Sequence, residues 1–138
     1  MMHQMIRRSV RFFSIAILSF FVISLLPATA ADDPNIPAKT KEKVLTALTA
    51  HIQSVQAKHQ GSFPVLDFTQ GKVIDLTLEK VHAGVVKKGD DGFFVSCADF
   101  RGKDRVLYDL DFLVDENFEV VLSFLHKKDG KKYNYEVE

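Results

Sequence analysis

Apolar residues between positions 37 and 60 recur at intervals of three and four, which is the spacing of one face of a helix. The residues on this face are Val44, Leu45, Leu48, Ile52 and Val55. Pro37 suits a first helical turn, and Gly61 suits the position just past the last turn. The pattern therefore predicts an amphipathic helix with one face to bury.

After Gly61 the apolar period changes to two, and turn residues interrupt it at short intervals. The pattern predicts a short segment over residues 63–69 and longer strands over residues 72–86, 93–101, 105–114, 118–126 and 132–137. The links are too short for a parallel crossover, so the strands should pair as antiparallel neighbours.

The alternation also assigns one face of the predicted sheet to the core. The expected inward residues are Ile74, Leu76, Leu78, Phe93, Val95, Cys97, Val106, Tyr108, Leu110, Phe112, Val114, Phe118, Val120, Leu122, Phe124, Tyr133, Tyr135 and Val137. A sheet with one apolar face needs a cover, and the helix can supply it. We expect an α+β fold in which one N-terminal amphipathic helix packs on a curved antiparallel β-meander of about five to six strands.

This order of elements resembles the cystatin-like and nuclear transport factor 2-like α+β rolls, and the resemblance implies a cystatin-like roll. Cystatins inhibit cysteine proteases through a Gln-x-Val-x-Gly hairpin. The nearest string here, residues 53–57 (Gln-Ser-Val-Gln-Ala), lacks the glycine and falls on the predicted helix. The inhibitory activity is therefore not carried over to this chain.

The first thirty residues have the layout of a secretory signal. Three arginines precede an uncharged apolar run over residues 12–26, and Pro27 and small residues follow it. The run is shorter than the roughly 20 residues of a spanning helix, although an uncleaved anchor is the alternative. No cysteine lies near residue 30, which excludes a lipoprotein. We expect cleavage after Ala30 or Ala31 and a soluble periplasmic or extracellular protein with no membrane span.

This layout divides the chain into a signal peptide (1–30), a turn-rich lead-in (31–37) and one α+β domain (38–138). Three further strings are residues 97–100 (Cys-Ala-Asp-Phe), 108–112 (Tyr-Asp-Leu-Asp-Phe) and 126–131 (His-Lys-Lys-Asp-Gly-Lys). They are similar to strings in small exported bacterial proteins of unassigned function, which implies a compartment and no activity.

Charge and cysteine content narrow the classes of function. The whole chain has 18 basic and 18 acidic residues, and three of the basic ones lie in residues 1–30. The remainder is slightly acidic, so we expect no nucleic-acid partner. Cys97 is the single cysteine and cannot form an internal disulfide. It is expected to be a small buried residue, with a reactive thiol or an intermolecular disulfide as the alternatives.

Some polar residues share the predicted core face near one end of the sheet. They are Lys80, His82, Asp99 and His126, with Tyr108 and Tyr133 close by. A carboxylate near a lysine and histidines could form an acid–base or ligand pocket, and two His with one Asp could hold a divalent transition metal. The alternative is a salt bridge between Lys80 and Asp99, with both histidines at the rim of the core.

Two further sets of polar residues are weaker candidates. Asp109 and Asp111 alternate with core residues, so they should lie on the outer face, where they could bind Ca²⁺ with Asp75 or Glu119 or simply be solvated. His51 and His59 lie on one side of the helix about 12 Å apart, too far to share one ion.

Large apolar residues are also expected on the outer face of the sheet. They are Phe94, Phe100, Leu107, Leu113, Val121 and Leu125. One helix cannot cover both faces, so this set is a candidate interface for a homodimer or another protein. Scattered surface apolar residues are the alternative.

No catalytic motif is evident, and we expect no cofactor. The sequence therefore favours a non-enzymatic exported binding or interaction module that acts through the outer face as a homodimer or with a protein partner. A structural accessory of a larger envelope complex cannot be distinguished from it. The alternative is a small enzyme or metal-binding protein with its pocket at Lys80, His82, Asp99 and His126.

Overall fold

The computed structural model describes residues 31–133, and the predicted signal peptide, Tyr135 and Val137 lie outside these residues. The described elements are α1 (Ala38–Lys58), β1 (Phe63–Asp67), β2 (Lys72–Val81), β3 (Val86–Lys88), β4 (Phe93–Gly102), β5 (Leu107–Val114), β6 (Val120–Lys128) and β7 (Lys131–Lys132). The α+β class is confirmed. Residues 31–37 precede the helix, so α1 is not at the start of the described chain, and seven strands replace the five to six expected.

The helix forms where the apolar period predicts it. Val44, Leu48 and Ile52 are buried on one face of α1. The chain leaves the helix through Gly61, whose φ of +89° lies in the left-handed region that glycine tolerates. Its backbone N–H donates to the Gln56 carbonyl at 2.8 Å. Within residues 31–133, no helix combines the length and the apolarity that crossing a bilayer requires.

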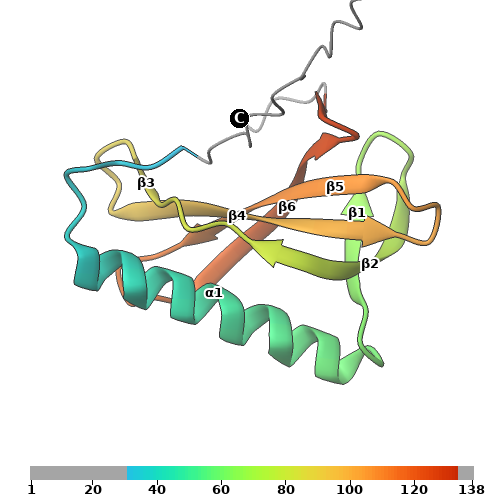
Figure 1. Ribbon diagram of the computed structural model, residues 1–138, viewed down its shortest axis with the longest axis horizontal. Helices are drawn as coiled ribbons and strands as arrows, with labels where there is room; N and C mark the ends of the chain where they lie inside the picture. Colours follow the sequence, from blue (N-terminus) through green and yellow to red (C-terminus); the bar gives the residue numbers. More distant parts are fainter. Residues whose placement is uncertain (1–30, 134–138) are drawn as a thin grey trace, which may run out of the picture.

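The seven strands form one antiparallel sheet in the order β1-β2-β4-β5-β6-β7, with β3 paired to β4. The sheet is strongly curled: β1 contacts β6, although β2, β4 and β5 lie between them in that order. Helix α1 runs along one face of the curled sheet (Figure 1). We call this the helix face and the opposite side the outer face.

The core lies between α1 and the helix face. Its larger cluster combines aromatic and aliphatic side chains from the helix and from five strands. The residues are Leu48, Ile52, Phe63, Val65, Leu76, Ala98, Phe100, Tyr108, Leu110, Phe112 and Leu125. A smaller cluster at the start of the helix contains Ile36, Val44, Val85 and Val114. Aromatic rings pack at the centre, where Phe112 lies 5.9 Å from Phe63 and 6.3 Å from Phe100 between ring centroids.

The facing of β5 agrees with the sequence pattern, but the facing of β4 is the reverse of the prediction. Phe100 pairs with Tyr108 and Ala98 with Leu110, so these β4 residues lie on the helix face. Val95, Cys97 and Asp99 therefore lie on the outer face. The cause is the hairpin loop, in which Gly102 N–H bonds to the Val106 carbonyl around three residues and Arg105 has a φ of +64°. A three-residue loop shifts the register by one residue compared with a loop of two or four residues. This shift moves every side chain of the strand to the opposite face of the sheet.

The facing of β6 is also altered, this time by β-bulges. The pairing with β5 shifts between Leu113 and Val114 and again between Asp109 and Leu110. Leu125 therefore faces the core opposite Leu110, whereas Leu122 and Phe124 lie on the outer face, contrary to the prediction. Each bulge inserts one extra residue and reverses the alternation beyond it.

Candidate functional site

Irregularities of the backbone bring polar side chains together on the outer face. A bulge on β2 between Leu78 and Lys80 places Lys80 opposite Asp99, and the following His82 donates its backbone N–H to the Cys97 carbonyl. The three-residue loop before β5 turns Cys97 and Asp99 outward. The bulge on β6 places His126 over β5, next to Asp109 and Asp111. We call His82, Cys97, Asp99, Asp109, Asp111 and His126 the outer-face cluster.

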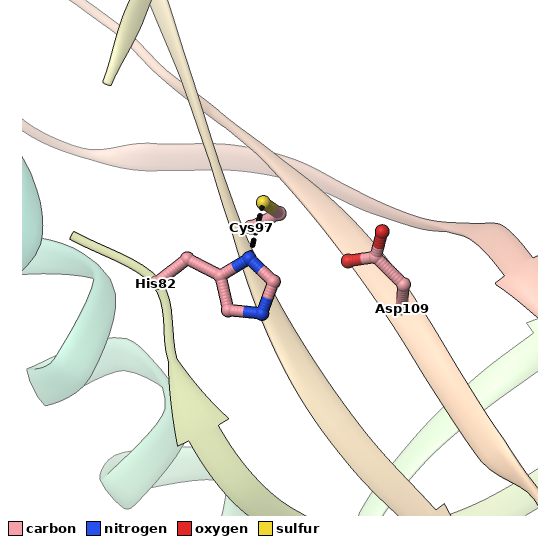
Figure 2. A group of neighbouring side chains, drawn as sticks. All are labelled: His82, Cys97 and Asp109. Carbon is pink, nitrogen blue, oxygen red and sulfur yellow. Dashed lines mark hydrogen bonds between the residues drawn. The ribbon is translucent and has the colours of Figure 1, made fainter. Parts of the chain in front are cut away.

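His82 lies between a thiol and a carboxylate. Its Nδ1 is 3.2 Å from Cys97 Sγ, and its Nε2 is 2.9 Å from Asp99 Oδ2. Figure 2 shows the imidazole over β4 beside the Cys97 sulfur, with the Asp109 carboxylate pointing toward both from β5. The Nε2–H of His82 can donate to Asp99, which leaves Nδ1 as the acceptor facing the sulfur. Asp99 therefore orients the ring.

The thiol of Cys97 is held in its neutral form. Burial raises the pKa of Cys97 to about 12, and the negative charges of Asp109, Asp111 and Asp99 act in the same direction. A thiolate is the reactive form of cysteine, and such a high pKa leaves almost none of it at neutral pH. The protonated S–H then donates to His82 Nδ1.

Asp109 is the member of the cluster with a shielded side-chain oxygen that lacks a hydrogen-bond partner among the described residues. Its side chain is 13% exposed, and its Oδ2 lies 3.6 Å from both His126 Nδ1 and Lys127 Nζ. Its Oδ1 is shielded from solvent and has no hydrogen-bond partner among the described residues. A buried carboxylate oxygen without a donor costs free energy, and such oxygens in native proteins usually have a specific cause, such as an ion.

Asp111 completes the cluster on the β6 side. Its Oδ1 lies 3.2 Å from His126 Nδ1. Burial raises the pKa of Asp111, and repulsion from Asp109 adds to the shift, while His126 opposes it. Asp109 and Asp111 are thus outer-face residues, as the sequence predicted. Their partner is His126, and their side chains are only 13% and 17% exposed, so they are not simply solvated.

The cluster contains two groups of residues whose side chains could hold a metal ion. One is His82, Cys97 and Asp109, and the other is Asp109, Asp111 and His126. Within each group the candidate ligand atoms all lie within 4.8 Å of one another. Ligands about 2.0–2.3 Å from a zinc ion are themselves roughly 3–4 Å apart, so small side-chain rotations would suffice in both groups.

The predicted pocket is only partly assembled. His82 and Asp99 are in contact and His126 lies in the same cluster, but all three lie on the outer face instead of the core face. Lys80 is exposed opposite Asp99, and no ion pair involving it is found among the described residues. Tyr108 and Tyr133 lie elsewhere: their hydroxyls donate to Asp104 at 3.1 Å and to Asp67 at 3.3 Å.

The predicted apolar interface needs a similar correction. Phe100 and Leu125 are buried in the core, and Phe94 packs against the smaller core cluster. The loop and the bulges described above turned these three residues inward. Leu107 and Leu113 are half-buried on the outer face, and Val121 is 51% exposed.

Sequence reasoning missed Cys97, Asp109 and Asp111 as partners of the predicted histidines. Cys97 was assigned to the core, because strict alternation places it there. The sequence does place His, Asp and Cys residues close together on neighbouring strands. This pattern indicates a shared site only when the register of the strands is known. His51, also considered in the sequence, packs edge-on against Phe63 and Phe112.

Comparison of the chain with protein-family models, with curated proteins and with solved structures finds no match.

Proposed function

We propose that this protein binds a divalent transition-metal ion, with zinc as the preferred ion, through His82, Cys97 and Asp109. The observation that carries the proposal is the convergence of an imidazole, a thiol and a shielded carboxylate whose Oδ1 has no partner. These three side chains come from β4, β5 and the segment just after β2, so the folded sheet holds them in place. The layout of residues 1–30 supports an exported location for this activity.

The surroundings of His82 favour a ligand role. Histidines that bind metals through one ring nitrogen commonly donate the other N–H to a carboxylate, which fixes the tautomer and the ring orientation. His82 has this arrangement, with Asp99 on Nε2 and the sulfur on Nδ1. Metal at Nδ1 would replace the thiol proton that now lies between the sulfur and the ring.

The donor set favours zinc over harder ions. Sulfur and nitrogen donors select borderline or soft ions, while Ca²⁺ and Mg²⁺ take oxygen ligands almost exclusively. A set of one sulfur, one nitrogen and one oxygen leaves a fourth tetrahedral position for water or another ligand, as in catalytic zinc sites.

A thiol-based acyl transferase is the competing interpretation, since Cys97, His82 and Asp99 are arranged like a nucleophile, its base and an orienting acid. The electrostatics disfavour it. An activated cysteine needs a lowered pKa, whereas burial and three carboxylates raise the pKa of Cys97 to about 12. A bound cation reverses this effect, because it neutralises the carboxylates and stabilises the thiolate.

The proposal predicts zinc binding that tightens as the pH rises. The metal displaces one proton from Cys97, so the apparent affinity should rise roughly tenfold per pH unit while the thiol is protonated. Calorimetry in buffers of different ionisation enthalpy measures the released proton.

Co²⁺ substitution tests the sulfur ligand, because a cobalt–thiolate bond gives a sulfur-to-metal charge-transfer band. Cys97→Ser should lose that band, whereas His59→Ala, which changes an exposed histidine of the same chain, should keep it. Wild-type protein that binds neither ion would overturn the proposal.

A protein-contact function is the second candidate. Val121 and Leu122 are 51% and 43% exposed at the start of β6, beside the half-buried Leu113 and Val95 on the outer face. This apolar end of the outer face is suited to self-association or to a protein partner. We also propose a cystatin-like roll for residues 38–133, because a helix followed by an antiparallel meander is the element order of that roll.

The contact candidate predicts a dimer that a charge on this face disrupts. Light scattering after size-exclusion chromatography should give a dimer mass for the wild type and a monomer mass for Leu122→Asp. Leu66→Asp is a matched control, because Leu66 is 40% exposed on β1. A monomeric wild type at high concentration, or equal effects of both variants, would contradict a dimer through this face.

A further inference from the structure

We propose that the outer-face cluster holds a second divalent ion, bound by Asp109, Asp111 and His126, so that the Asp109 carboxylate bridges two ions. This inference rests on the proposed function, because the first ion is the one bound by His82 and Cys97. It adds a distinct site with its own ligands and changes the stoichiometry from one ion to two.

The second site has ligand atoms from two strands. Asp109 and Asp111 extend from the same face of β5, and His126 reaches them from the bulge on β6. His126 Nδ1 lies 3.2 Å from Asp111 Oδ1 and 3.6 Å from Asp109 Oδ2, which are separations that two ligands of one ion can adopt. His126 is the extra residue of this bulge, so both His126 and its neighbour Lys127 reach the carboxylates of β5.

Asp109 is placed to serve both ions. It belongs to both candidate groups, its Oδ2 faces His126, and its Oδ1 is shielded and unpartnered. A carboxylate has two oxygens and can bridge a pair of ions about 3.5–4 Å apart, which is the spacing of two-metal sites. The shielded Oδ1 then gains a partner that no described side chain provides.

Charge balance explains how the cluster stays folded without ions. Lys127 Nζ lies 3.6 Å from Asp109 Oδ2 and, together with His126, offsets the charges of Asp109 and Asp111. The lysine side chain is long, flexible and partly exposed, so a divalent ion can displace its ammonium group into solvent. Lys127 therefore acts as a competing cation, and its removal should favour the second ion.

The donors of the two sites differ in hardness. The first site offers sulfur, nitrogen and oxygen, while the second offers two carboxylates and one imidazole, a set that also accepts harder ions such as Mn²⁺. A Co²⁺ titration can therefore separate the sites, since only the first site produces a sulfur-to-cobalt charge-transfer band.

The test is a Zn²⁺ and Co²⁺ titration of the purified protein, with bound ions counted by native mass spectrometry and affinities measured by calorimetry. We expect two ions in the wild type and one in His126→Ala and in Asp111→Asn, both of which should keep the charge-transfer band. Lys127→Ala should bind the second ion several-fold more tightly. Asp75→Asn, an exposed aspartate of β2, is the matched control and should bind two ions.

The outcomes separate this inference from the proposed function. A wild type that binds one ion with the charge-transfer band, and whose binding is unchanged in His126→Ala, overturns the second site and leaves the first. A wild type that binds no ion overturns both. Circular dichroism of each variant shows whether it is folded, and Asp111→Asn is nearly isosteric, so the second site can be tested even if His126→Ala does not fold.

Discussion

Asp109→Asn is expected to abolish zinc binding while leaving the metal-free protein at least as stable as the wild type. The substitution removes a ligand that both candidate ion sites share. Loss of a ligand should weaken binding by on the order of 100-fold or more, since even the groups that orient ligands are worth about 10–100-fold. Calorimetric titration with Zn²⁺ measures this loss directly.

The stability half of this prediction follows from the carboxylate's environment. Asp109 Oδ1 is shielded without a donor, and the carboxylate lies among Asp99 and Asp111. Asparagine removes that charge and adds an amide that can donate, which offsets the lost contacts with His126 and Lys127. Thermal unfolding without metal should therefore give a Tm no lower than the wild type's.

With zinc present, the wild type should have a higher Tm than Asp109→Asn, the reverse of the order expected without metal. At 100 times Kd a ligand adds about 2.7 kcal/mol to the stability of the state that binds it, so zinc should raise the Tm of the wild type. It should leave Asp109→Asn unchanged. Asp75→Asn serves as the control, because its side chain is exposed on β2 and belongs to neither group. A metal-free Asp109→Asn protein that is strongly destabilised would show that Asp109 is structural.

Phe112→Ala is expected to destabilise the domain by about 3–5 kcal/mol, the usual cost of removing a buried aromatic ring. Phe112 is fully buried and packs against Phe63, Phe100 and His51, so the cavity would open at the centre of the core. Small domains have about 5–15 kcal/mol of stability in total, and this variant would therefore be marginal.

Urea denaturation followed by circular dichroism measures this change. Phe68→Ala is the matched control, because it removes the same atoms from a side chain that is 63% exposed, and it should shift the free energy of unfolding by about 1 kcal/mol or less. Equal losses in the two variants would contradict the assignment of Phe112 to the core centre.

The sequence predicted the elements of this fold well because their signals are local. The three-to-four spacing around Leu48 places the helix, and the period-two runs place the strands and their antiparallel order. The facing of β5 also follows, since Tyr108, Leu110, Phe112 and Val114 are all buried, as their alternation indicates. These features depend on hydrophobic periodicity within one segment and need no knowledge of the neighbouring strands.

The candidate site was predicted only in part, because it depends on register. The structure brings His82 and Asp99 into contact and places His126 beside Asp109 and Asp111. Strict alternation had placed all three predicted residues on the core face, with Cys97 as a buried apolar residue. Each of these positions lies beyond a bulge or a three-residue loop. One inserted residue moves every side chain that follows it in the strand to the opposite face of the sheet. Insertions in several neighbouring strands can therefore keep residues together and move them all to the other face.

The sequence by itself determined the α+β class, the amphipathic helix and the antiparallel order of the strands, because each is encoded in the spacing of apolar residues within a segment. Only the tertiary structure decided which face carries the outer-face cluster and that Asp109 lies between Cys97 and His126. The physical reason is that these relations depend on the pairing of four chain segments. That pairing is set by backbone irregularities at Glu79, Arg105, Val121 and His126, which the hydrophobic period does not reveal.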